Sequence, residues 1–464
     1  MSGLTGREET SDHEHYTSPN TPTTMGRSPF HRRDVLASIS AGLGVLAGCT
    51  ARNPFTERTG ASQSDLSDPY NAGAQGIAGD GETEVGEAVQ ELLDTVDSEG
   101  GGVIYFPPGR YLFERTPLVG SNTSLVGAGR STVFEGVRPD DEKGRALLSN
   151  KGYDRPRYGG ASNWSVRNLR IDAPDSNGIM PAHAENVRLK NIHGDAIRHH
   201  HIDVVSSRNV VVDGYWASRG GEADSNAPIQ FDAQQRGTTV NAVWDGTDGV
   251  LVADDGTPTE RCTLRNFEIA AENGPSHGVH IHRGPHESIT VVNGSITGCQ
   301  FTAIRADPES RLANVTVDNI SCLENARGIT LGHVERGRRD LTITNVTIRT
   351  DDSELAAGSG LYAAGVDGSG VSNVTVRGAF TNSIIFDDMR DLRLTNVTAT
   401  GAVDQSFRFR ENVDVTLTAA RAADSGGAAI YAGSGSTVAY GGVTFDNVGS
   451  EVAGDGEVEP WNAS

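Results

Sequence analysis

Short stretches in which apolar and polar residues alternate recur along most of the chain. Alternation at a period of two is typical of a β-strand that is buried on one face. Ten of these stretches align, and they begin at Asn163, Asn186, Asn209, Arg261, Ser288, Asn314, Asp340, Asn373, Asp391 and Asp414. Successive starts lie 18 to 33 residues apart, except for one interval of 52 residues. The spacing indicates a repeat array.

Asparagine recurs at a fixed place in these repeats. Five positions after the start, seven of the ten stretches carry Asn168, Asn191, Asn266, Asn293, Asn319, Asn345 and Asn396. Asparagine tolerates the left-handed backbone conformation that a sharp turn needs, and stacked amides hydrogen bond from coil to coil. We therefore expect a turn lined by stacked asparagine side chains.

A second series of short strands alternates with the first. Its members begin at Ile202, Ile229, Val279, Ile304, Ile329, Leu361, Ile384 and Phe407. Two interleaved ladders at about 25 residues per coil leave no room for helices between them. The sequence predicts an all-β parallel solenoid of about ten coils. An amphipathic helix over residues 84–97 is expected to cap its N-terminal end, where strand edges would otherwise be unpaired.

The segment around this helix carries a set of ordered motifs. Gly79-Asp-Gly comes first, then the helix, then Gly101-Gly-Val-Ile-Tyr-Phe-Pro-Pro-Gly and Leu125-Val-Gly-Ala-Gly. This order resembles the entry of the pectate-lyase-like superfamily. The resemblance implies a right-handed parallel β-helix with an N-terminal capping helix, and an extracellular polysaccharide as the partner.

The first 48 residues are predicted to be an export signal. They combine a polar start, Arg32-Arg33 and a short apolar stretch that ends at Leu46-Ala-Gly-Cys49. These features resemble a twin-arginine signal and a lipoprotein processing box, which implies lipidation of Cys49 and anchoring to the outer face of the cell membrane. We further expect a flexible tether over 49–70, the β-helix over 71–445 and an acidic C-terminal tail over 446–464.

The chain is strongly acidic. It has 61 Asp and Glu against 39 Lys and Arg, for a formal net charge of -22. Such a surface repels polyanions, so we expect no nucleic-acid partner. The acidic, lysine-poor composition is similar to that of proteins from extreme halophiles, because at molar salt the Debye length falls to about 3 Å and self-repulsion vanishes. No apolar run reaches the length of a membrane span, which excludes a polytopic membrane protein and leaves the lipid anchor as the only expected link to the membrane.

The histidines point to a candidate site. Ten of the 13 lie between His183 and His333. Equivalent positions in successive coils lie about 4.8 Å apart, so the ladder alignment predicts columns of outward side chains. One column reads Asp203, Gln230, His280, Arg305 and Thr330, and the next reads Asp232, His282 and Asp307. We predict that the catalytic residues are Asp232, Asp307, His282, His280 and Arg305.

Further residues are predicted to bind the substrate. They are His201, Asp203, Gln230, His277, Trp216 and Trp244. The two tryptophans, together with Tyr215, offer flat apolar faces that suit a pyranose ring. Trp244 lies in the segment 238–258, which would form either one more coil or a loop above the columns.

Several chemistries fit these columns. In a glycoside hydrolase, Asp232 and Asp307 would act as a carboxylate pair, and two coils set their backbones about 9.6 Å apart, nearer the inverting than the retaining separation. In a polysaccharide lyase or epimerase, Arg305 or His282 would remove the proton beside a uronate carboxylate, whose charge an arginine or a divalent cation such as calcium would neutralise. A metal site built on His280-x-His282, with His201, Asp203 or Asp232 available as a further ligand, is a third interpretation. A non-catalytic glycan-binding or surface structural protein would use the same stack as a platform.

Overall fold

The computed structural model describes residues 69–136, 146–172, 177–195, 199–217, 227–233, 242–243, 250–251, 255–270, 277–332 and 338–461. The chain divides into two units, residues 1–62 and 63–464, and all described residues belong to the second. The predicted export signal, Cys49, Trp244 and nearly all of the predicted tether lie outside the described residues.

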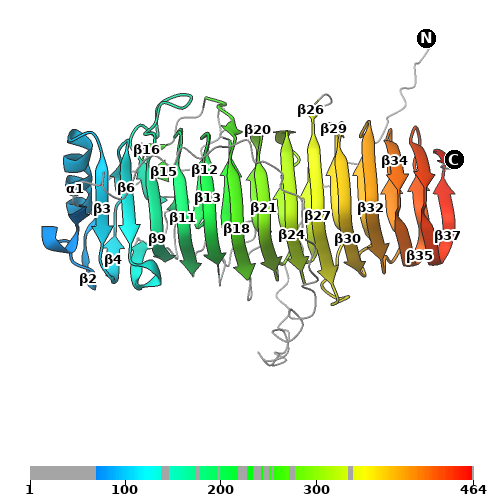
Figure 1. Ribbon diagram of the computed structural model, residues 1–464, viewed down its shortest axis with the longest axis horizontal. Helices are drawn as coiled ribbons and strands as arrows, with labels where there is room; N and C mark the ends of the chain where they lie inside the picture. The colour runs from blue at the N-terminus through cyan, green and yellow to red at the C-terminus, as the bar shows by residue number, and fades with distance from the viewer. Residues whose placement is uncertain are drawn as a thin grey trace, which may run out of the picture. The chain divides into compact units, whose positions relative to one another are not determined.

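The second unit is a parallel β-solenoid of about twelve coils, which run in chain order from the blue to the red end of Figure 1. Its first ladder pairs, in order, β1 (Tyr70–Asn71), β3 (Gly102–Phe106), β6 (Thr123–Gly127), β9 (Ser165–Asp172), β11 (Arg188–Asp195), β13 (Val211–Ala217), β18 (Thr263–Ala270), β21 (Thr290–Thr297), β24 (Val315–Leu323), β27 (Leu341–Thr350), β30 (Gly370–Gly378), β32 (Leu392–Thr400), β34 (Asp414–Thr418), β36 (Thr437–Gly441) and β38 (Glu457–Pro460).

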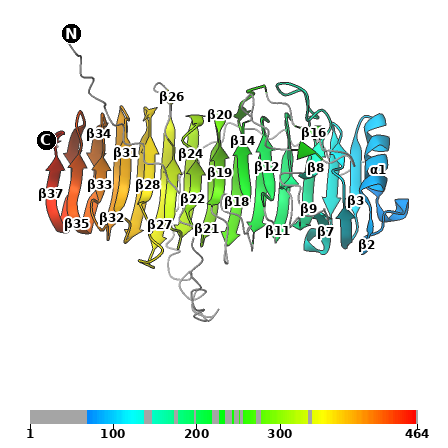
Figure 2. The same ribbon diagram turned by 180° about the vertical axis from the view of Figure 1, so that it is seen from behind.

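The second ladder runs beside the first, and many of its strands are labelled in Figure 2. It pairs, in order, β5 (Leu118–Val119), β8 (Ala146–Asn150), β10 (Asn177–Ile179), β12 (Ile202–Val205), β14 (Ile229–Asp232), β19 (His277–His282), β22 (Thr302–Ala306), β25 (Arg327–Leu331), β28 (Ser359–Ala364), β31 (Asn382–Asp387), β33 (Phe407–Phe409), β35 (Arg421–Ala432) and β37 (Thr444–Gly454). Both predicted strand series are therefore confirmed.

Shorter strands complete the solenoid. Near the N-terminal end, β2 (Asp80–Glu84), β4 (Gly109–Phe113) and β7 (Thr132–Gly136) pair in parallel. A third ladder consists of β17 (Thr259–Glu260), β20 (Gly284–Glu287) and β23 (Ser310–Ala313). Two small separate sheets are β15 (Ala242–Val243) with β16 (Val250–Leu251), and β26 (Arg338–Arg339) with β29 (Val366–Asp367). Single 3₁₀ turns span Gly73–Gln75 and Gly129–Ser131.

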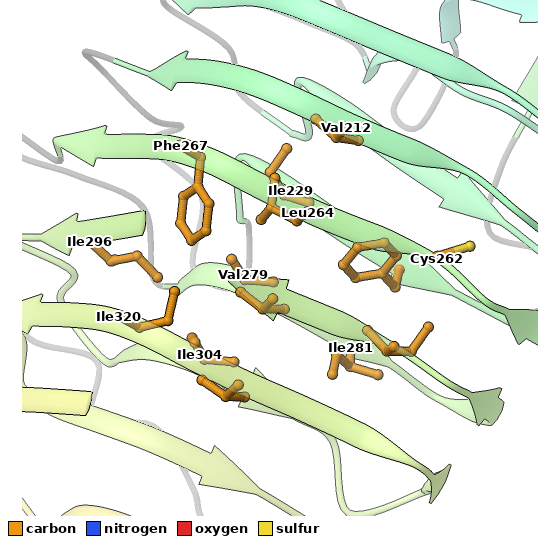
Figure 3. Close-up of a cluster of buried hydrophobic side chains, with 14 of the residues drawn as sticks. Val212, Ile229, Cys262, Leu264, Phe267, Val279, Ile281, Ile296, Ile304 and Ile320 are labelled. Carbon is orange, nitrogen blue, oxygen red and sulfur yellow. The ribbon is translucent and has the colours of Figure 1, made fainter. Parts of the chain in front are cut away.

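The apolar side chains of each coil point inward and pack against those of the coils before and after it. Figure 3 shows Val212 and Leu264 of the first ladder facing Ile229, Val279 and Ile281 of the second. All five are fully buried. Because the inner positions carry β-branched or aliphatic residues in coil after coil, one continuous core runs through the solenoid.

Helix α1 (Gly86–Ser98) lies at the N-terminal end of the stack, as predicted (Figure 1). Its apolar stripe, formed by Val89, Leu92, Leu93 and Val96, is buried in the solenoid core. This burial removes the first coil from solvent. Among the described residues, no helix has the length and apolar character needed to cross a membrane.

The predicted asparagine turn is confirmed. All seven asparagines have left-handed backbone angles, with φ between 53° and 57°. Their amides also stack from coil to coil, since Asn191 Nδ2 donates to Asn168 Oδ1 at 2.9 Å and Asn319 Nδ2 donates to Asn293 Oδ1 at 2.9 Å.

The structure decides one point that the sequence left open and corrects one predicted boundary. The interval of 52 residues is one coil with an insertion, because β13 pairs directly with β18 and β14 with β19. The predicted tail over 446–464 begins inside the solenoid, since β37 and β38 pair in parallel with β35 and β36. A last coil packs on one side only, so the few apolar residues of this acidic segment suffice to hold it. With these strands and the early coils before Asn163, the solenoid has about twelve coils, where the sequence predicted about ten.

Candidate active site

The second ladder brings the predicted columns together. In the register of β12, β14, β19 and β22, Asp203 pairs with Gln230, Gln230 with His280 and His280 with Arg305. Two residues further along the same strands, Asp232 pairs with His282. The predicted vertical alignment is confirmed, and Figure 2 shows these four strands next to one another.

An imidazole lies between two carboxylates at the middle of this ladder. His282 Nδ1 is 3.3 Å from Asp232 Oδ1, and His282 Nε2 is 3.6 Å from Asp307 Oδ2. The three residues come from consecutive coils. The side chain of His282 is 16% exposed, whereas those of Asp232 and Asp307 are 3% and 9% exposed. His282 is therefore the member of this trio that a ligand reaches most easily.

Asp307 is also held by cationic and donor groups on its other oxygen. Arg305 Nη2 lies 3.1 Å and His280 Nε2 lies 2.9 Å from Asp307 Oδ1. Burial alone would raise the pKa of Asp307, but the hydrogen bond from His280 and the charge of Arg305 outweigh it and hold that pKa well below its usual range. Asp307 is thus a carboxylate at any ordinary pH.

The neighbouring histidines are neutral, and their partners fix their tautomers. Burial lowers the pKa of His280, and burial together with the neighbouring His280 and Arg305 lowers that of His277 to about 2. Because Arg305 Nη1 donates to His277 Nε2 at 2.9 Å, the His277 proton is on Nδ1. Because His280 donates through Nε2, its Nδ1 is an acceptor. Neither Nδ1 atom has a hydrogen-bond partner among the described residues.

Asp203 forms a separate, fully buried part of the network. Its carboxyl group accepts from Asn177 Nδ2 at 3.1 Å and from Gln230 Nε2 at 3.3 Å. Burial raises the pKa of Asp203 well above its usual range, and the nearby charge of Asp232 raises it further. The surroundings of the two carboxyl groups therefore shift their pKa values in opposite directions, upward for Asp203 and downward for Asp307.

Other predicted substrate-binding residues lie elsewhere. His201 is fully buried and its Nδ1 is hydrogen bonded to the hydroxyl of Tyr215, which is itself fully buried. β12 begins only at Ile202, so its alternation of inward and outward side chains does not apply to His201, which lies in the preceding turn. The prediction that His201 and Tyr215 lie on the surface is therefore wrong, because both lie in the interior. Trp216 is 36% exposed but stands on β13 of the first ladder, with its indole stacked 4.7 Å from the His193 ring.

Asp232, His277, His280, His282, Arg305 and Asp307 are here called the cluster. Two residues that sequence reasoning missed also belong to it. Phe301 is 47% exposed, directly before β22, and its ring centre is 6.1 Å from that of His277. His200 is buried, with its Nδ1 2.6 Å from the Ala227 carbonyl oxygen, and burial lowers its pKa to about 3. An aromatic residue in the turn that precedes a predicted site strand was the signal available for Phe301. The run His199-His-His201 offered no means of telling which imidazole faces the site.

Among the described residues, no group of three or more His, Cys, Asp or Glu side chains is arranged to hold a metal ion. Cys262, Cys299 and Cys322 are free thiols buried in the core, as expected for small apolar residues.

Comparison with known families places this geometry in context. The family described as Rhamnogalacturonase A/epimerase, pectate lyase-like, matches residues 70–305, about half of the chain. The chain belongs to this family. The matched region includes β12, β14 and β19, and it contains every residue of the cluster except Asp307.

Individual relatives differ in their activities. Alginate lyase 7 of Azotobacter vinelandii is 28% identical over 116 residues, which are 23% of this chain and 13% of the relative, so the chain spans a small part of that protein's length. The Streptococcus pneumoniae surface adhesin PfbA superposes with a TM-score of 0.57 at 14% identity, covering 83% of this chain and 93% of the adhesin. The Family 28 exopolygalacturonase of Yersinia enterocolitica gives a TM-score of 0.54 at 11% identity, covering 85% and 79%. These structures share the fold.

Proposed function

We propose that this protein is an inverting glycoside hydrolase that acts on an extracellular polysaccharide. The observation that carries the proposal is the imidazole of His282 between the carboxylates of Asp232 and Asp307. The two carboxylates come from coils two steps apart, about 9.6 Å in backbone terms, which is nearer the inverting than the retaining separation. The family description names a rhamnogalacturonase, which supports this class of reaction, and an epimerase, which supports the second candidate below.

The electrostatics suggest how the roles are divided. Asp307 is the ionised carboxylate, so it would orient and activate the attacking water. Asp232 and His282 would hold the proton for the leaving oxygen, and His282, as the more exposed of the two, would deliver it. Arg305 and His280 keep Asp307 ionised and in place.

An exposed aromatic residue beside these histidines favours a sugar ring as the ligand. Phe301, exposed beside His277, supplies an apolar face for the pyranose ring.

A second candidate is a uronate lyase or epimerase, favoured by the partly exposed guanidinium of Arg305, whose side chain is 36% exposed. Here Arg305 would neutralise the uronate carboxylate, with or without a divalent cation such as calcium. The ion pair argues against it, because the guanidinium of Arg305 is already engaged by Asp307.

The test is incubation of the purified protein with a panel of neutral and acidic polysaccharides at low and at molar salt. A hydrolase releases reducing ends without ultraviolet absorbance, a lyase also produces the absorbance of unsaturated uronates, and a non-catalytic glycan-binding protein binds without releasing either. General acid–base groups contribute about 10²- to 10⁴-fold, so Asp232→Asn and His282→Gln should each lower kcat by that amount.

The matched control is His193→Gln, which makes the same change on the first ladder. It should leave kcat unchanged. Normal turnover in both Asp232→Asn and His282→Gln would remove the cluster from the mechanism.

The location outside the cell is a separate proposal that rests on the sequence. A twin-arginine signal over residues 1–48 and a lipid on Cys49 would place the solenoid on the outer face of the membrane, where polysaccharide is met. Cys49→Ala should release the protein from the membrane fraction, and replacing Arg32 and Arg33 with lysine should retain it inside the cell. A molar-salt habitat, proposed from the net charge of -22, predicts that activity rises with salt.

A further inference from the structure

The column that carries His280 and Arg305 changes its exposure along the solenoid axis. On the N-terminal side of the cluster, Gln230 is 3% exposed and Asp203 is 0% exposed. The register places Met180 and Ser149 before them, and both are also fully buried. On the C-terminal side, the same column continues as Thr330, Tyr362, Ile385, Arg408 and Tyr431, all partly exposed. The change from buried to accessible falls at the cluster.

Residues 151–160, here called the N-terminal wall, account for part of this burial. Tyr153 of the wall packs with Met180, Ala182 and Val205 in a small apolar cluster outside the main core. Val205 is the register partner of Asp232, so the cover reaches the coil next to the proposed acid. The column therefore ends beneath apolar side chains on this side.

The N-terminal wall is held in place by several contacts. The Arg157 backbone N–H donates to Asp255 Oδ2 at 2.6 Å, and the Tyr158 hydroxyl donates to the Pro258 carbonyl oxygen at 3.0 Å. The guanidinium of Arg208 lies 4.5 Å above the Tyr158 ring. With a charged hydrogen bond, a neutral one and a cation–π contact, the wall is a fixed part of the structure.

The accessible side offers groups that suit a sugar chain. Tyr362 and Tyr431 provide aromatic rings, and the guanidinium of Arg408 lies 5.4 Å from the centre of the Tyr431 ring. Five coil steps separate Arg305 from Tyr431, a length of about 24 Å, which spans several sugar units.

We propose that the enzyme attacks the end of a polysaccharide chain. The terminal sugar lies at the cluster against the N-terminal wall, and the rest of the polymer extends along the C-terminal column over Thr330, Tyr362, Arg408 and Tyr431. This inference rests on the proposed hydrolase function, and it adds that the substrate is a chain end and that the product is short.

The experiment is a time course with the full-length protein on a long polysaccharide that it degrades, with reducing ends, viscosity and product size followed together. We expect one short product from the earliest time point and an almost constant viscosity while reducing ends accumulate. A ladder of oligosaccharides with an early fall in viscosity would overturn the chain-end inference and leave the hydrolase function intact. No new reducing ends on any polysaccharide would overturn the hydrolase function, and the inference with it.

A substitution on the C-terminal column gives an independent check. Tyr431→Ala should raise KM for the long substrate by about 2- to 12-fold, the range of an aromatic contact, with kcat unchanged. For the shortest substrate that is cleaved, KM should not change, because that substrate does not reach Tyr431. Tyr105→Ala, at the other end of the first ladder, is the matched control and should alter neither value. An unchanged KM for the long substrate in Tyr431→Ala would contradict the proposed path.

Discussion

The buried His201 makes the solenoid sensitive to acid. Its imidazole is fully buried against the Tyr215 hydroxyl, and burial lowers its pKa to about 3. An unfolded histidine has a pKa of about 6.5. Between these two values the unfolded chain takes up a proton that the folded chain does not, so the free energy of unfolding falls as pH falls from about 6.5 towards 3.

The size of this effect follows from the two pKa values. At pH 5 the unfolded His201 is almost fully protonated and the folded one is not, while at pH 7 both are mostly neutral. One pKa unit is worth about 1.36 kcal/mol, so this residue alone lowers the free energy of unfolding by about 2 kcal/mol between pH 7 and pH 5. His200, His277 and His286 have pKa values lowered mainly by burial, to about 3, 2 and 4, and act in the same direction.

The assay is denaturant unfolding at pH 7 and pH 5 in the same salt, followed by circular dichroism, for the wild type and for His201→Gln. Glutamine offers an amide to the Tyr215 hydroxyl and does not titrate. The loss of stability on going from pH 7 to pH 5 should be about 2 kcal/mol smaller in the variant, whatever its stability at pH 7. An identical loss in both proteins would refute the assignment of His201 as a neutral interior imidazole.

Other changes test the fold in the same unfolding assay. Tyr215→Phe removes the hydroxyl partner of buried His201 and should cost about 1–3 kcal/mol. Gly194→Ala would place a Cβ atom next to the His201 ring, since the ideal position is 2.3 Å from Nδ1, and should cost about 1–3 kcal/mol through overpacking, with a lower Tm. Asn191→Ala removes the side-chain hydrogen bond to Asn168 and puts alanine at a left-handed backbone position. The free energy of unfolding should therefore fall by about 1–2 kcal/mol. Thermal melts from low to molar salt should show a rising Tm, because screening relieves the repulsion of a chain with net charge -22.

The ladder and its register could be predicted from the sequence because two local signals agree in almost every coil. Inward apolar residues such as Ile229 and Val279 repeat at one interval, and asparagines such as Asn191 mark the turn that closes it. A register slip of one residue would turn every inward side chain outward, so the pattern allows a single alignment. That alignment was enough to bring Asp232, His282 and Asp307 together.

The remaining features depend on parts of the coil where alternation stops. His201 precedes the first residue of β12, and its direction is set by the space above Gly194, which no local pattern encodes. Phe301 stands in a turn, where exposure follows from the path of the chain. The burial of Asp203 and Gln230 depends on segments packed over the ladder, such as the N-terminal wall, which are far away in the sequence.

The coil from β13 to β18 holds about twice as many residues as its neighbours, yet β14 and β19, which flank the extra residues in the sequence, remain in register. Extra chain can therefore be added at this turn without displacing the strands that present the acids. In this architecture the length of a loop can change while the positions of the strands stay the same. Exchanging residues 234–254 for a segment of different length should thus leave the spacing of the acidic and imidazole groups unchanged.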